Sequence, residues 1–143
     1  MDLYSIALFV HIAGAVLVFV LLTVEGFGPQ TGARLNRILG PISALAILVP
    51  GFYMAAQTGW HAWTATGLVT YVLIAIAGAY TGINVMRGRM TPSAARVSWL
   101  ARIGMAAGVL FDMTVKPDTL RSIVAILVGV AIAVPAMRLV RTA

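Results

Sequence analysis

The chain has 143 residues, of which 61% are hydrophobic and 10% charged, and its mean hydropathy is +0.99. This composition lies far outside the range of soluble domains and indicates an integral membrane protein. The formal net charge is +6, but most of the basic residues lie between apolar segments, so they indicate membrane topology rather than a nucleic-acid partner. The absence of cysteine excludes disulfides, thiolate metal sites and cysteine nucleophiles.

The first apolar segment, residues 3–24, contains no Asp, Glu, Lys or Arg and is long enough to cross about 30 Å of hydrocarbon. Only Asp2 precedes it, without a basic stretch, so we expect a transmembrane helix over residues 3–25 and not a cleavable signal. The next stretch, residues 25–33, holds three glycines and a proline. These residues predict a loop that closes the first helix.

The second apolar segment, residues 38–86, is also free of Asp, Glu, Lys and Arg but is too long for one crossing. A polar turn at residues 57–61 interrupts it. The sequence therefore predicts two helices here, over residues 34–56 and 62–86.

The Thr-Pro pair at residues 91–92 is typical of a helix start, and it predicts a fourth helix over residues 92–115. A fifth crossing follows over residues 119–138, capped by Asp118 or Thr119. We therefore expect an all-α fold: one polytopic transmembrane domain over the whole chain, with a four-helix core plus a fifth transmembrane helix.

The basic residues set the expected orientation. Five crossings place most of them at one side of the membrane: Arg34, Arg37, Arg87, Arg89, Arg96, Arg138 and Arg141. The other side has only Lys116 and Arg121. By the positive-inside rule the arginine-rich side is cytoplasmic, so the N-terminus lies outside and the C-terminus inside.

The fourth helix carries ionisable residues where lipid would otherwise be expected. Spacings of three and four residues place one stripe of side chains along it: Arg102, Met105, Val109, Asp112 and Lys116. A charge at mid-bilayer costs at least ~2.5 kcal/mol, so this stripe should face neighbouring helices.

The first helix repeats this pattern with His11 and Glu25, which are separated by the same 14 residues as Arg102 and Lys116. Antiparallel packing of the two helices would bring Glu25 to Arg102 as a structural ion pair. It would also place His11 level with Asp112 and Lys116, so that the two helices share a polar seam. Alternatively, Asp112 and Lys116 form a local surface pair one helical turn apart.

His11 is the most informative polar residue of the first helix. An imidazole at this depth either forms a hydrogen bond in the core, transfers protons, or ligates a metal or haem. His61 lies in the polar turn, where an interfacial role is expected, and Met54 and Met113 supply thioether sulfur in the same half of the bundle.

Two short motifs resemble a known group of small bacterial membrane proteins. Residues 9–15 read FVHIAGA and residues 113–117 read MTVKP. Together they are similar to the group that includes HemJ-type protoporphyrinogen oxidases and CopD-like copper-resistance domains, and most similar to its branch without an assigned function. The resemblance implies an inner-membrane protein that binds b-type haem, with His11 and Lys116 at the essential histidine and lysine positions.

The leading hypothesis is therefore a membrane-embedded haem b or porphyrin-binding redox protein. His11 is the expected axial ligand, Lys116 is expected near a propionate, and Asp112 and Arg102 are further candidates for cofactor contacts.

Two alternatives belong to other classes. A copper-handling protein would use an imidazole and thioether site made of His11, His61, Met54 and Met113, a donor set suited to Cu(I). A non-catalytic accessory subunit would dock its apolar surface onto a larger membrane complex or a second copy of the chain.

Overall fold

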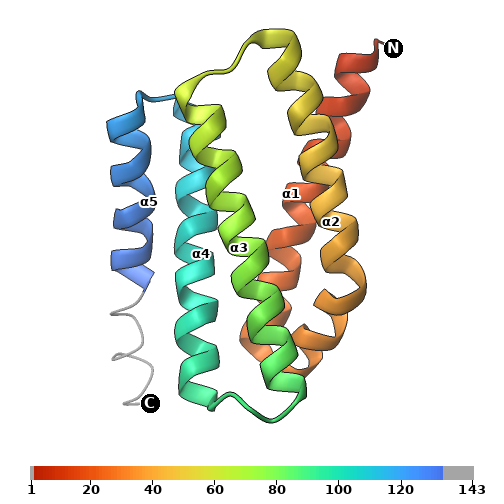
Figure 1. Cartoon of the computed structure of the whole chain (residues 1–143), viewed down its shortest axis with the longest axis vertical. Helices are drawn as coiled ribbons and strands as arrows, with labels where there is room; N and C mark the ends of the chain where they lie inside the picture. The colour runs from red at the N-terminus through yellow and green to blue at the C-terminus, as the bar shows by residue number, and fades with distance from the viewer. Residues whose placement is uncertain (1, 134–143) are drawn as a thin grey trace.

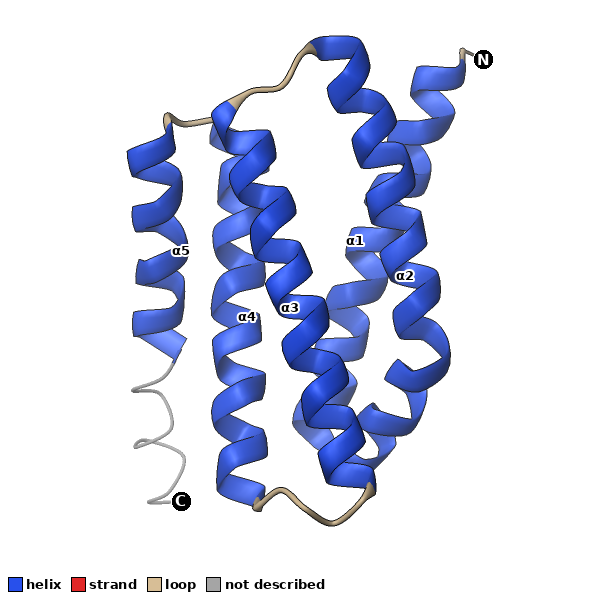
Figure 2. Ribbon diagram, in the orientation of Figure 1, coloured by secondary structure: helices blue, strands red, loops and turns tan. Residues whose placement is uncertain are grey.

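The computed structural model describes residues 2–133, which form a bundle of five α-helices in which consecutive helices run antiparallel (Figure 1). The helices are α1 (Leu3–Phe27), α2 (Pro29–Thr58), α3 (Ala62–Met86), α4 (Pro92–Val115) and α5 (Thr119–Ala133). Short turns are the only other structure in this part of the chain (Figure 2). The predicted all-α helical bundle is confirmed.

Helices α1 to α4 are each long and apolar enough to cross a membrane. Helix α5 has 15 described residues, a length of about 22 Å at 1.5 Å per residue. The predicted continuation of this helix to residue 138 lies outside the described residues, as do Arg138 and Arg141.

The predicted loop over residues 25–33 is wrong, because α1 continues to Phe27 and α2 begins at Pro29. Gly28 alone separates the two helices, in an extended conformation, and Pro29 occupies the first helical position, where its missing N–H costs nothing. Gly32 lies inside α2 against α1: a Cβ atom there would be 2.5 Å from the Cα atom of Glu25. The glycines therefore allow two helices to approach closely, and they do not form a loop.

The predicted starts of α4 and α5 are confirmed by their caps. The Thr91 hydroxyl accepts a hydrogen bond from the N–H of Ala94 at 3.3 Å, at the start of α4. Of the two candidates for α5, Asp118 is the cap, because its Oδ1 accepts from the N–H of Arg121 at 2.9 Å.

Helix α4 lies between α3 and α5, and α1 and α2 pack together on the other side of the bundle (Figure 1). A small apolar cluster of Leu22, Ile74 and Ala106 joins α1, α3 and α4 at the centre. At the interface of α4 with α5, Gly104 meets Gly129 so closely that a Cβ on either residue would overlap the backbone of the other helix. Helix α5 is thus held by backbone contact along one face of α4.

Candidate functional site

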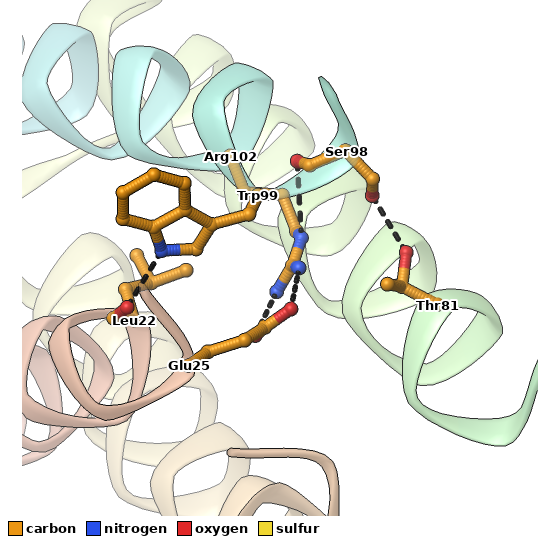
Figure 3. Close-up of polar contacts among 6 residues, drawn as sticks. All are labelled: Leu22, Glu25, Thr81, Ser98, Trp99 and Arg102. Carbon is orange, nitrogen blue, oxygen red and sulfur yellow. Dashed lines mark hydrogen bonds and ion pairs between the residues drawn. The ribbon is translucent and has the colours of Figure 1, made fainter. Parts of the chain in front are cut away.

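Glu25 of α1 and Arg102 of α4 form a buried ion pair (Figure 3). The Nη1 atom of Arg102 donates to Oε2 of Glu25 at 2.9 Å, and Nη2 donates to Oε1. The third donor, Nε, contacts the Ser98 carbonyl oxygen at 3.3 Å. The side chain of Arg102 is 2% exposed and that of Glu25 is 10% exposed. The predicted ion pair is therefore present, in the two-bond geometry that fixes both side chains.

Two further hydrogen bonds beside this ion pair join α4 to its neighbours (Figure 3). Trp99 Nε1 donates to the Leu22 carbonyl oxygen at 2.7 Å, linking α4 to α1. The hydroxyls of Thr81 and Ser98 lie 2.6 Å apart, linking α3 to α4. The sequence did not reveal these contacts, although an indole N–H inside an apolar span needs an acceptor and could have suggested the first.

The predicted polar seam between α1 and α4 ends at the ion pair. Asp112 is fully buried against α5, where it faces Ser122, and His11 contacts α2. The reason is helical geometry: ten residues at 3.6 per turn place Asp112 about 80° around α4 from Arg102. The stripe therefore faces two different helices: Arg102 faces α1, and Asp112 faces α5.

Lys116 does not continue the stripe either. It is the residue that ends α4, in the left-handed conformation at φ 53°, and its Nζ lies 5.5 Å from the centre of the Trp63 ring. The alternative of a surface pair with Asp112 is also wrong, because Asp112 is 0% exposed and neither carboxylate oxygen has a hydrogen-bond partner within residues 2–133.

His11 has a defined hydrogen bond. Its Nδ1 lies 2.9 Å from the carbonyl oxygen of Ile47 on α2. A carbonyl can only accept, so Nδ1 carries the proton and Nε2 keeps its lone pair in the neutral ring. Gly51 makes room for the imidazole, since a Cβ there would lie 3.2 Å from His11 Cε1.

The imidazole of His11 lines a cavity of about 430 Å³ among α1, α2, α3 and α4, which we call the His11 cavity. Its walls are mostly apolar and include Phe19, Trp60 and Leu68. Met113 also lines it, with its Cε close to Gly67 of α3. This cavity thus combines one imidazole and one thioether in apolar surroundings.

The remaining copper candidates lie elsewhere. His61 stacks against Trp63, with ring centres 6.1 Å apart, and neither His61 nor Met54 lines the His11 cavity. Within residues 2–133 no three His, Cys, Asp or Glu side chains gather closely enough to hold a metal ion. Of the four predicted copper ligands, only His11 and Met113 line the same cavity.

The four haem candidates are also distributed over separate places. His11 lines its cavity, Lys116 lies over Trp63, and Asp112 is buried beneath α5. Arg102 lines a second cavity of about 350 Å³, which we call the Arg102 cavity.

Polar groups that the sequence analysis did not single out line the Arg102 cavity, namely Asn36, Ser43 and Tyr71. Asn36 and Ser43 are seven residues apart, two helical turns, and this spacing on α2 was the available signal. Tyr71 also lines the His11 cavity, so it belongs to the layer that separates the two.

Comparison with protein-family models, curated proteins and solved structures gives no significant match.

Proposed function

We propose that this protein is a membrane-embedded haem b-binding redox protein, with the His11 cavity as the haem site and His11 as an axial ligand. One observation carries the proposal: the Ile47 carbonyl fixes the imidazole of a cavity-lining histidine in the tautomer whose Nε2 is free to coordinate. Haem-ligating histidines need their second ring nitrogen held in this way, because the bond orients the ring and raises its basicity.

The chemistry of the cavity supports this ligand class, and its size is that of a small-molecule site. A volume of about 430 Å³ lies within the range of roughly 300–1,000 Å³ typical of small-molecule sites. Apolar walls would exclude water from the face of a porphyrin. Because Gly51 has no side chain, the imidazole of His11 can lie close to α2. Lys116 lies beside Trp63 at the end of the bundle where Trp60 borders the cavity, and we propose it as the cation for a propionate.

Bound haem would supply one-electron redox chemistry at iron. The chain's own contribution is to hold the iron through His11 and to tune its potential by keeping the surroundings apolar.

The absorption spectrum of the purified protein, before and after titration with hemin, tests the proposal. We expect a Soret band at one haem per chain, lost in His11→Ala and retained in His61→Ala, whose ring stacks on Trp63 outside the cavity. A wild-type protein that gives no Soret band, or an unchanged band in His11→Ala, would overturn it.

Copper handling is the second candidate, because His11 and Met113 line the same cavity and together suit Cu(I). Metal analysis of the same preparations separates the two: this candidate expects copper without a Soret band, lost in both His11→Ala and Met113→Leu.

We further propose that the protein lies in a bacterial inner membrane with its arginine-rich end in the cytoplasm. The support is a group of exposed arginines at one end of the bundle, where α1 is joined to α2 and α3 to α4. They are Arg34, Arg37, Arg87, Arg89 and Arg96. A reporter inserted at residues 57–61 should then be external and one inserted at residues 88–90 cytoplasmic; the reverse result would contradict this orientation.

A further inference from the structure

The Arg102 cavity has the composition of an anion site. Helices α1, α2 and α3 form its walls, and Arg102 closes it from α4. Two guanidinium groups line it, Arg37 and Arg102, against the single carboxylate of Glu25. The lining therefore keeps one positive charge in excess after the ion pair is formed.

Two nitrogen donors converge on one point of this cavity. A Cβ atom at Gly78 on α3 would lie 3.3 Å from Nη1 of Arg102 and 3.4 Å from Nδ2 of Asn36. Gly78 has no side chain, so the donors from α4 and α2 approach the same small space at the cavity wall. Such convergence of donors from separate helices is what recognition of an oxyanion requires.

Both donors have hydrogen-bonding capacity left. A guanidinium carries five N–H groups, and the contacts to Glu25 and Ser98 use three, so Nη1 and Nη2 keep one each. The amide of Asn36 makes no hydrogen bond with other residues in the described part of the chain. Arg102 is 2% exposed, and an unsatisfied N–H at that depth is unfavourable unless a ligand or water accepts from it.

Apart from Ser43 and Tyr71, the remaining walls are apolar and extend toward the centre of the bundle, where Val18 and Ile74 border both this cavity and the His11 cavity. At its other end the cavity reaches Arg37 and Met86, at the arginine-rich end of the bundle, which faces the lipid head groups in the orientation proposed above. A free inorganic anion would satisfy the donors but leave the apolar walls unfilled. An amphiphile with an acidic head and an acyl chain matches both parts.

We propose that the Arg102 cavity binds an anionic lipid, with Arg102, Asn36 and Arg37 contacting its phosphate or carboxylate head and an acyl chain lying against the apolar walls. This site is separate from the proposed haem site and does not depend on it.

Lipid binding can be measured by native mass spectrometry and thermal unfolding of the whole protein in a neutral detergent. Phosphatidylglycerol should bind at one per chain and raise the melting temperature, whereas phosphatidylcholine and inorganic phosphate should do neither at equal concentration. Equal binding of both lipids would overturn the acidic-head requirement. Full stabilisation by inorganic phosphate alone would show that the cavity binds a free anion and would overturn the proposal of a lipid ligand.

Two exposed arginines on α2 provide a matched pair of variants. Arg37 lines the cavity and Arg34 does not, so Arg37→Gln should weaken phosphatidylglycerol binding by about fivefold while Arg34→Gln should leave it unchanged. Equal weakening by both would mean that general surface charge attracts the lipid.

A second pair tests the convergence point. Gly78→Ala places a methyl group against both donors and should abolish head-group binding. Gly82, one turn further along α3, also lines the cavity, but a methyl group there meets only Ala33, at 3.9 Å, and neither donor, so Gly82→Ala should retain head-group binding. His11→Ala should also retain lipid binding, which separates a failure here from a failure of the haem proposal. Unchanged binding in Gly78→Ala would overturn the assignment of Arg102 and Asn36 as the head-group donors.

Discussion

Two carboxylates are buried in this bundle, and they are held in opposite ways. Glu25 forms two hydrogen bonds with Arg102 at the interface of α1 and α4. Asp112 lies at the interface of α4 and α5, where both carboxylate oxygens and the facing Ser122 hydroxyl have no hydrogen-bond partner within residues 2–133. One acid is therefore buried with its partner, and the other is buried at a helix interface without a hydrogen-bond partner in the described residues.

The difference shows that the position of an acid in an apolar helix does not define its energetic role. A buried ion pair contributes little net stability, but removing one member leaves an uncompensated charge in a low-dielectric environment. Asp112 has no ion-pair partner in the described part of the chain, so removing it leaves no such charge behind there. The two acids should therefore respond very differently to substitution, although both are almost completely inaccessible.

The largest effect is expected at the ion pair. Arg102→Leu or Glu25→Leu should each destabilise the protein by about 3–5 kcal/mol, because each leaves a buried charge without its partner. The double variant should lose much less than the sum of the two losses. Unfolding in mixed detergent micelles, measured for the wild type and the three variants, gives the coupling energy; strictly additive losses would mean that the pair does not interact in the folded protein.

The next largest effect should come from separating α4 and α5. Gly104→Val places branched carbons where the Gly129 backbone lies, so it should push α5 away at a cost of about 1–3 kcal/mol or more. Ser122→Cys provides the measurement, because the chain has no other cysteine and Ser122 is 0% exposed. A maleimide should label this thiol only when Gly104→Val is also present.

Gly82→Ala is the control for that labelling, since its Cβ meets only ordinary contacts on another face of the bundle. Equal labelling of Ser122→Cys with and without Gly104→Val would show that glycine contact does not hold α5 in place.

A smaller effect is expected at Asp112. Asp112→Asn keeps the size of the side chain and removes a carboxylate that has no hydrogen-bond partner among residues 2–133, so the free energy of unfolding should change by less than about 1 kcal/mol. The matched comparison is Glu25→Gln in the same assay, which should cost several times more. A loss at Asp112 as large as that at Glu25 would indicate a partner for Asp112 in the membrane.

Helix number and the long-range ion pair could be predicted from the sequence because each depends on a simple regularity. Charge-free runs predict the first three helices, and an acid and a base inside apolar segments of antiparallel helices predict the pairing of Glu25 with Arg102. The surroundings of Asp112 could not be predicted this way. They depend on α5 docking against Gly104 through Gly129, and a small-residue pattern on α4 indicates a close helix contact without identifying the partner helix.

The donors at Gly78 and the junction at Gly28 escaped prediction for a related reason. A glycine in the sequence indicates equally a loop, a close helix contact or space for a neighbouring side chain. Only the three-dimensional arrangement distinguishes Gly32, which meets Glu25, from Gly78, which leaves space for Asn36 and Arg102.

The smallest effect concerns a third carboxylate, Asp2, which is fully exposed but has a partner. Two hydrogen bonds from Ser5 lower the pKa of Asp2 below its ordinary value. The larger contribution comes from the Ser5 side chain, and the smaller from the Ser5 N–H, whose nitrogen lies 2.8 Å from Oδ1 of Asp2. When the pKa of a carboxyl is lower in the folded state than in the unfolded state, its contribution to stability is complete at any pH above the unfolded-state pKa. That contribution is lost as the pH falls through the folded-state pKa.

Amide exchange at Ser5 in the wild type should therefore accelerate in acid, relative to exchange at neighbouring residues. In Asp2→Ala the relative rate should be faster at neutral pH and should not change on acidification; an identical pH profile in both proteins would show that the Asp2 cap does not hold the start of α1.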